Sequence, residues 1–272
     1  MTPTPLANGF CFGEGPRWFE GLLWFSDMLG EAVHTVDMHG GLTTLPLPGH
    51  HPSGLGFRPD GSLLISSTKK CRVLRYDGEN VTEIADLSMT VPASLGDMVV
   101  DDDGRAYVGS QAREGGLIVR LDPDGTSTVV ADDLDFPNGM VITPDRATLI
   151  VAESIGRRLT AYAIAADGSL TDRRTFADGL DGPPDGICLD AEGGVWTAMT
   201  LAHQFERIIE GGVVTDRVDI GERTAIACAL GGPERRTLFL LSSTDAYPQR
   251  LIGTKLSRVD ATTVGIPGAG LP

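Results

Sequence analysis

The chain alternates short apolar runs with tight polar turns from one end to the other. Pro59-Asp60-Gly61 separates the apolar residues 55–57 from residues 63–65. Two strands that meet at such a turn form a β-hairpin. The same layout returns at residues 102–104, 144–146, 191–193 and 233–235, and a degenerate first copy spans residues 17–21.

Each hairpin is followed by two further strand-like segments. Residues 72–76, 117–121 and 159–163 alternate apolar and polar positions, and a more polar segment such as 81–85 or 127–131 closes the unit. No long amphipathic helix pattern interrupts the series. Four antiparallel strands per repeat are typical of a propeller blade.

One position, just before the first strand of each repeat, places all repeats on a common scale. Successive positions are 39, 43, 42, 47 and 42 residues apart, and they are Glu14, Ser53, Gly96, Asn138, Asp185 and Ala227. Propeller blades span about 40 to 50 residues. The sequence therefore predicts an all-β, six-bladed β-propeller that forms a single domain over residues 1–272. We expect residues 256–264 and 6–10, from the two ends, to share the last blade.

Composition and charge limit the classes of partner and the cellular location that we expect for this protein. The 35 glycines and 17 prolines, without a collagen-like period, suit many turns between short strands. A net charge of −15 repels phosphate backbones and anionic bilayers, so we expect no nucleic-acid and no membrane partner. The four cysteines lack CxxC spacing, and no signal peptide or run of ~20 apolar residues is evident. These features predict a cytoplasmic protein.

Three of the six equivalent positions carry oxygen ligands. The first strand of a blade lines the central channel, so Glu14, Asn138 and Asp185 should converge at one end of it. Two carboxylates ~4 Å apart repel each other by roughly 4 kcal/mol at an effective dielectric near 20, which either a proton on one of them or a cation between them relieves. An all-oxygen set selects a hard ion. We expect one divalent metal ion, calcium first, with magnesium, manganese or zinc as alternatives.

A plainer interpretation exists for each of these residues alone. Asn-Gly and Asp-Gly are strong turn dipeptides, and an acidic residue before glycine needs no metal to explain it. Glu14, Asn138 and Asp185 all precede glycine. Their common position in three different repeats favours the metal site over three independent turns.

The segments Glu14-Gly15-Pro16, Pro137-Asn138-Gly139-Met140 and Pro184-Asp185-Gly186 resemble the signatures of the senescence-marker-protein/gluconolactonase (regucalcin-like) family, and the resemblance extends over all six blades. It implies a six-bladed propeller whose divalent ion is bound by the three matching residues. It also implies a small-molecule substrate, through hydrolysis of sugar lactones or related esters, with Asp185 as the general base or as the group that orients the attacking water.

The chain departs from the family pattern at two positions. Sugar lactonases of this family typically have Asn-Asp where this chain has Gly96-Asp97, and often an arginine at Ser94. Hydrogen-bond donors and a positive charge are lost, so we expect a smaller or more apolar lactone or ester. The candidate substrate-binding residues are Ser53, Ser94, Asp97, Glu153 and His203. His203 lies in the loop 200–204 and is also a candidate acid.

Several functions remain open at this point. The leading hypothesis is a metal-dependent hydrolase that opens a lactone or ester at the central channel. The same site could support phosphotriesterase-like chemistry. A repurposed biosynthetic enzyme that opens or closes a ring, and a non-catalytic propeller that binds a metal or a partner, are the alternatives. The substrate, the native ion and the oligomeric state are left open by the sequence.

Overall fold

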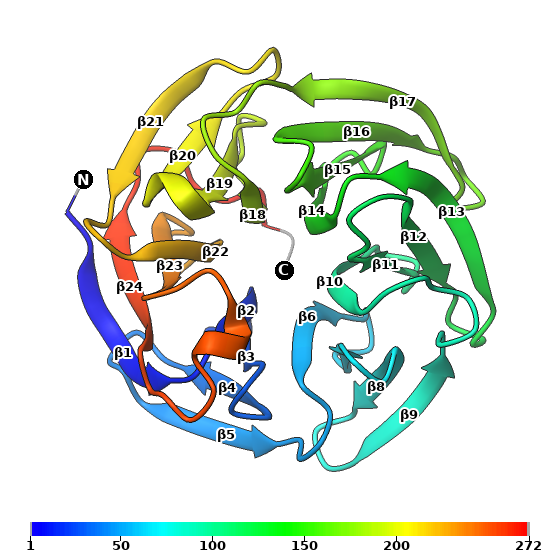
Figure 1. Cartoon of the computed structure of the whole chain (residues 1–272), viewed down its shortest axis with the longest axis horizontal. Helices are drawn as coiled ribbons and strands as arrows, with labels where there is room; N and C mark the ends of the chain where they lie inside the picture. The colour runs from blue at the N-terminus through cyan, green and yellow to red at the C-terminus, as the bar shows by residue number, and fades with distance from the viewer. Residues whose placement is uncertain (1, 271–272) are drawn as a thin grey trace.

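Six four-stranded antiparallel sheets stand as blades around a central channel in the computed structural model, which describes residues 2–270 (Figure 1). The predicted six-bladed β-propeller is confirmed. In the first five blades the strands lie in chain order from the channel outward. Blade 1 consists of β2 (Gly13–Phe19), β3 (Leu22–Asp27), β4 (Ala32–Val36) and β5 (Leu42–Pro46), and blade 2 of β6 (Pro52–Phe57), β7 (Leu63–Ser67), β8 (Arg72–Tyr76) and β9 (Val81–Asp86). Blade 3 consists of β10 (Leu95–Val100), β11 (Ala106–Ser110), β12 (Gly116–Leu121) and β13 (Ser127–Leu134), blade 4 of β14 (Pro137–Ile142), β15 (Thr148–Glu153), β16 (Arg158–Ile164) and β17 (Leu170–Ala177), and blade 5 of β18 (Pro184–Leu189), β19 (Val195–Met199), β20 (Gln204–Ile208) and β21 (Val214–Asp219).

The sixth blade joins the two ends of the chain. It consists of β22 (Thr224–Gly231), β23 (Thr237–Ser243), β24 (Ser257–Thr263) and, outermost, β1 (Thr4–Phe10). Figure 1 shows β1 along the outside of β24, and Pro5 is paired with Asp260. The expected shared last blade is therefore confirmed, and its backbone hydrogen bonds close the ring without a free gap between the first and last repeats.

Helical structure is minor in the part of the chain that is described. Two short 3-10 turns, η1 (Thr200–Ala202) and η2 (Pro248–Arg250), lie in connections between strands. No helix among residues 2–270 is long and apolar enough to cross a membrane.

The hydrophobic core lies between neighbouring blades. Phe19 of blade 1 stacks on Phe57 of blade 2 with ring centroids 3.8 Å apart. Trp18 of blade 1 stacks on Phe239 of blade 6 at 5.3 Å. Each blade is apolar on both faces and buries them against its two neighbours, so the ring is held by packing at every blade boundary.

The six equivalent positions lie inside the innermost strands, so the expectation that they precede those strands was wrong. In five blades the position is the second residue of the strand, as for Asn138 in β14 and Asp185 in β18. Asn138 and Gly139 together stand opposite a single residue of β15, and Asp185 and Gly186 likewise face one residue of β19. Such a β-bulge re-aims a side chain. These dipeptides are bulges in strands, and the turn interpretation does not apply to them.

The glycines after these positions let neighbouring innermost strands touch through their backbones. A Cβ added to Gly139 would lie 2.6 Å from both the Asp185 carbonyl oxygen and the Ile187 nitrogen. A Cβ on Gly54 would lie 2.5 Å from the Met98 nitrogen. The innermost strands of adjacent blades are in contact all round the channel. Glycine at this place therefore draws the strands together at the level where the candidate ligands sit.

Gly139→Ala is expected to destabilise the fold by about 1 to 3 kcal/mol, because the added methyl collides with backbone that cannot rotate away. Gly265→Ala is the matched control, since a Cβ there meets nothing within 4 Å and its backbone is not left-handed. Urea unfolding of the two variants measures the difference. Equal stabilities would contradict the close backbone approach.

Candidate metal and active site

Glu14, Asn138 and Asp185 are buried at the same end of the central channel. Each is less than 10% exposed although all three are polar. The Asn138 Nδ2 donates hydrogen bonds to the Asp185 Oδ1 and, at 3.3 Å, to the Ser154 Oγ. The Thr200 Oγ1 lies 3.5 Å from the other Asp185 oxygen. Two residues 47 positions apart in sequence, Asn138 and Asp185, are thus in direct contact.

The carboxylates of this group are electrostatically costly. Burial raises the pKa of Glu14 well above its usual range, and the charges of Asp185 and Asp97 raise it further. Burial also raises the pKa of Asp185 well above its usual range, and Asp97 adds to the effect. The buried Glu14 Oε2 has no hydrogen-bond partner. Buried negative charge without a partner is what a bound cation neutralises.

Asp97 and Arg17 lie next to this group and were not both anticipated. Burial raises the pKa of Asp97 while the charge of Arg17 opposes that rise, and the Asp97 Oδ1 lacks a hydrogen-bond partner. The Arg17 guanidinium donates to the carbonyl oxygens of Pro16 and Met98. Sequence reasoning named Asp97 but missed Arg17, although it directly follows the Glu14-Gly15-Pro16 segment.

The donor set fits a hard divalent ion. Two carboxylates and one amide oxygen are the ligand types that calcium and magnesium prefer. The Asn138 Oδ1 accepts one hydrogen bond, from the Gln111 Nε2 at 3.1 Å, which leaves one lone pair free. Among residues 2–270, no group of three or more His, Cys, Asp and Glu side chains is spaced to hold a metal ion. An ion here would therefore depend on the neutral oxygen of Asn138.

Of the predicted substrate-binding residues, Ser53 is itself one of the six equivalent positions, and Ser94 lies two residues before Gly96. Ser53 is buried, and its carbonyl oxygen accepts a hydrogen bond from the Ser26 Oγ at 2.6 Å. Ser94 is half-buried, and its carbonyl oxygen accepts the Gln111 backbone N–H at 2.9 Å. Both backbones thus brace the innermost strands.

Glu153 does not join this group, because its carboxylate is fully engaged elsewhere. The side chain is inaccessible to solvent and pairs with Arg158 at 2.6 Å and with Arg173 at 3.2 Å. Burial disfavours its charge, but hydrogen bonds from Arg158, the Asp135 N–H and Thr160 outweigh burial and lower its pKa. Glu153 thus fastens the β13–β14 connection to blade 4, and no oxygen is left for a substrate.

His203 also stands apart from the three candidate ligands. It ends η1 in a left-handed conformation, with φ of 57°, and its side chain is exposed. Its Nδ1 lies 2.8 Å from the Arg223 carbonyl oxygen, which positions the ring towards blade 6. The imidazole links two connections on this face of the propeller.

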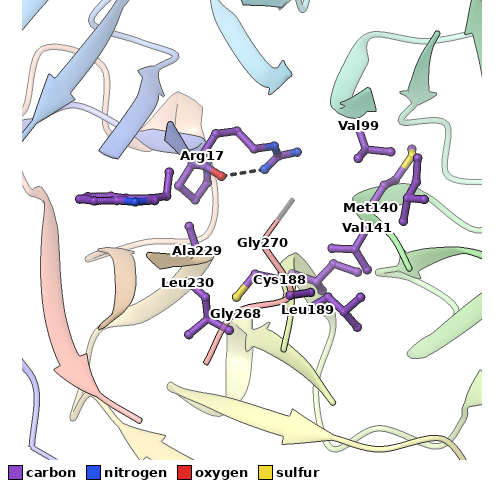
Figure 2. Close-up of a pocket in the computed structure, with 15 residues that line it drawn as sticks. Arg17, Val99, Met140, Val141, Cys188, Leu189, Ala229, Leu230, Gly268 and Gly270 are labelled. Atoms are coloured by element: carbon purple, nitrogen blue, oxygen red, sulfur yellow. Dashed lines mark hydrogen bonds between the residues drawn. The ribbon is translucent and has the colours of Figure 1, made fainter. Parts of the chain in front are cut away.

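The opposite end of the channel holds a small cavity of about 50 Å³ (Figure 2). Its walls come from the far ends of the innermost strands, including Arg17, Met140 and Cys188, and from Gly268 and Gly270. The Ala269 N–H donates to the Leu189 carbonyl oxygen at 3.0 Å, so residues 268–270 cross this end. The cavity has room for a few water molecules only.

Comparisons with known proteins identify the family and the fold. The model of the SMP-30/gluconolactonase/LRE-like region matches residues 12–244. A 6-deoxy-6-sulfogluconolactonase of Pseudomonas putida is 30% identical, covering 96% of this chain and 94% of that protein. A pentonolactonase of Haloferax volcanii is 29% identical, covering 89% and 86%. The structure of a calcium-binding regucalcin from Agrobacterium tumefaciens matches with a TM-score of 0.79 at 24% identity, covering 98% and 92%, which concerns the fold.

Proposed function

Because this chain belongs to the SMP-30/gluconolactonase/LRE-like family, we propose that it is a lactonase-type hydrolase that opens a small lactone or a related ester. The observation that carries the proposal is the burial of Glu14, Asn138 and Asp185 at one end of the channel. Two relatives that cover most of the chain are named as lactonases.

We further propose that Glu14, Asn138 and Asp185 hold one divalent metal ion, with calcium as the expected ion. The unpartnered Glu14 Oε2 and the raised pKa values of Glu14 and Asp185 support a cation at this place. A related propeller is named as a calcium-binding protein. Bound there, the ion would polarise the lactone carbonyl and acidify a water molecule.

Asp185 is the proposed general base. Asn138 and Thr200 hold its two oxygens, so the carboxylate has a fixed direction. It takes a proton from water as the water oxygen bonds to the carbonyl carbon. When the ring carbon–oxygen bond breaks, the proton passes to the departing oxygen, and the product is a hydroxy acid.

The proposed substrate is less polar than a sugar lactone. Two of the six equivalent positions, Gly96 and Ala227, bring no polar side chain to the channel, and Ser94 brings no charge. A polyhydroxy lactone would therefore leave several hydroxyl groups without partners, which costs affinity. A lactone with an alkyl substituent needs no such partners, so the absence of polar side chains does not lower its affinity.

A substrate panel tests the proposal. Glucono-δ-lactone, δ-valerolactone, an alkyl-substituted γ-lactone, p-nitrophenyl acetate and a phosphotriester are each assayed with calcium and with chelator. We expect calcium-dependent opening of the alkyl lactones at a higher kcat/KM than that of gluconolactone. Calcium binding without hydrolysis of any lactone or ester would contradict the proposal and favour a biosynthetic or a binding role. Turnover of the phosphotriester alone would reassign the reaction.

A further inference from the structure

A neighbouring side chain explains why position 96 is a glycine. Its backbone is not left-handed, so its conformation does not require glycine. Space does require it, because an added Cβ would lie 2.4 Å from the Nε2, 2.5 Å from the Cδ and 2.7 Å from the Cγ of Gln111. A side chain at position 96 and the present Gln111 side chain exclude each other.

Gln111 is well placed to occupy this space. It directly follows β11, and its backbone N–H donates to the Ser94 carbonyl oxygen at 2.9 Å, which ties it to the start of β10. Its half-buried side chain lies over Gly96 and reaches blade 4, where the Nε2 donates to the Asn138 Oδ1 at 3.1 Å. The third blade thus places an amide at the channel from the loop that follows its second strand.

The hydrogen bond from Gln111 and the hydrogen bond to Asp185 together determine how the Asn138 amide is turned. The Asn138 Nδ2 donates to Asp185 and to Ser154, and the Oδ1 accepts from Gln111. Without Gln111 the oxygen has no donor in this arrangement, and rotation of the amide about its last bond exchanges oxygen and nitrogen. An exchanged amide would set its oxygen against the Asp185 carboxylate and turn its N–H groups to the side where the Oδ1 now has a free lone pair.

We propose that Gln111 replaces the ring side chain that Gly96 lacks and is a positioning residue for Asn138. The inference rests on the proposed function, because Asn138 matters as a ligand only if an ion binds. Asp97, the next residue along β10, does not fill this role, since it is buried beside Arg17. Partners of metal ligands typically change affinity or activity 10- to 100-fold when they are removed.

The test compares Gln111→Met, which keeps length but cannot hydrogen-bond, with Gln204→Met. Gln204 is a matched control, because its Nε2 donates to the Glu206 Oε1 at 2.7 Å and not to the ring. Calcium affinity is measured by titration calorimetry without substrate, and kcat and KM are measured separately. We expect Gln111→Met to weaken calcium binding by on the order of tenfold and Gln204→Met to leave it unchanged.

An asparagine placed on β10 at position 96 tests whether an amide there can restore the calcium affinity that is lost without Gln111. In the double variant G96N/Q111A, an asparagine takes the space that Gln111 vacates, and calcium affinity should recover most of the loss. G96N with Gln111 retained should unfold at a lower temperature than the double variant, because the two side chains collide.

The outcomes separate the two proposals. If wild type binds calcium and Gln111→Met binds it equally well, the role of Gln111 is wrong while the metal site stands. An equal loss in Gln204→Met would likewise overturn it, since the effect would not be specific. If wild type binds no divalent ion, the proposed function fails at its metal site, and the inference fails with it. Equal stability of G96N and the double variant would contradict the exclusion.

Discussion

Asp185→Asn is expected to lower kcat by about a thousandfold or more while the propeller remains folded. General-base catalysis contributes about 10²- to 10⁴-fold, and an amide cannot accept the proton. Folding should not suffer, because the substitution removes a buried charge whose pKa is already raised by burial and by Asp97. Hydrolysis of the best lactone of the panel is followed at saturating calcium, and circular dichroism reports the fold.

Two controls make this result specific to the base. Asp181→Asn changes an exposed carboxylate just before β18 and should leave kcat unchanged. Calorimetry reports whether Asp185→Asn still binds calcium, since the asparagine keeps one oxygen ligand. Full activity in Asp185→Asn would rule out Asp185 as the base. Activity that returns completely at high calcium would reduce its role to that of a ligand.

Removal of divalent ions is expected to abolish hydrolysis and to destabilise the protein more at pH 8 than at pH 5. Burial raises the pKa values of Glu14, Asp97 and Asp185 in the fold. The folded protein then holds protons more tightly than the unfolded chain, so this contribution is fully present below the ordinary carboxyl pKa of about 4 and is lost as pH rises through the folded pKa. Calcium at the proposed site would replace the lost protons, and at 100 times its Kd it would add about 2.7 kcal/mol.

Thermal unfolding at the two pH values, with calcium and with EDTA, measures this effect. The difference between the calcium and EDTA melting temperatures should be larger at pH 8. In the variant E14Q/D185N, two of the carboxyls are gone, and both the calcium effect and most of its pH dependence should disappear. A calcium effect of the same size at both pH values would mean that these carboxyls do not share their site with protons.

The fold could be predicted from the sequence because its unit repeats. Six copies of one hairpin pattern fix the number of blades, and the last strand-like run lacked a partner until residues 6–10 supplied one. The exact place of the ring residues could not be predicted, since a bulge at Asn138 or Asp185 leaves no mark that differs from a turn dipeptide.

The candidate site was predictable only where one position recurs in every blade. Glu14, Asn138 and Asp185 share that position, so spacing alone brought them together. Gln111 belongs to a loop, and nothing in the sequence indicates that its side chain lies over Gly96. Glu153 shows the reverse case, because a carboxylate at a strand end looks available until Arg158 and Arg173 are seen to engage it.

The segment 268–270, which crosses the end of the channel opposite the candidate ligands, has a consequence for the entry of substrate and the release of product. With residues 268–270 over one end, the proposed reaction at Asp185 would require the lactone to enter and the hydroxy acid to leave by the other end. Substrate and product differ in charge, since a lactone is neutral and the hydroxy acid formed from it is an anion. The net charge of −15 does not hinder the neutral lactone and repels the anion outside the site, whereas the proposed ion would attract the product carboxylate inside it. Once the product has left the ion, the surface charge therefore favours its release and opposes its return.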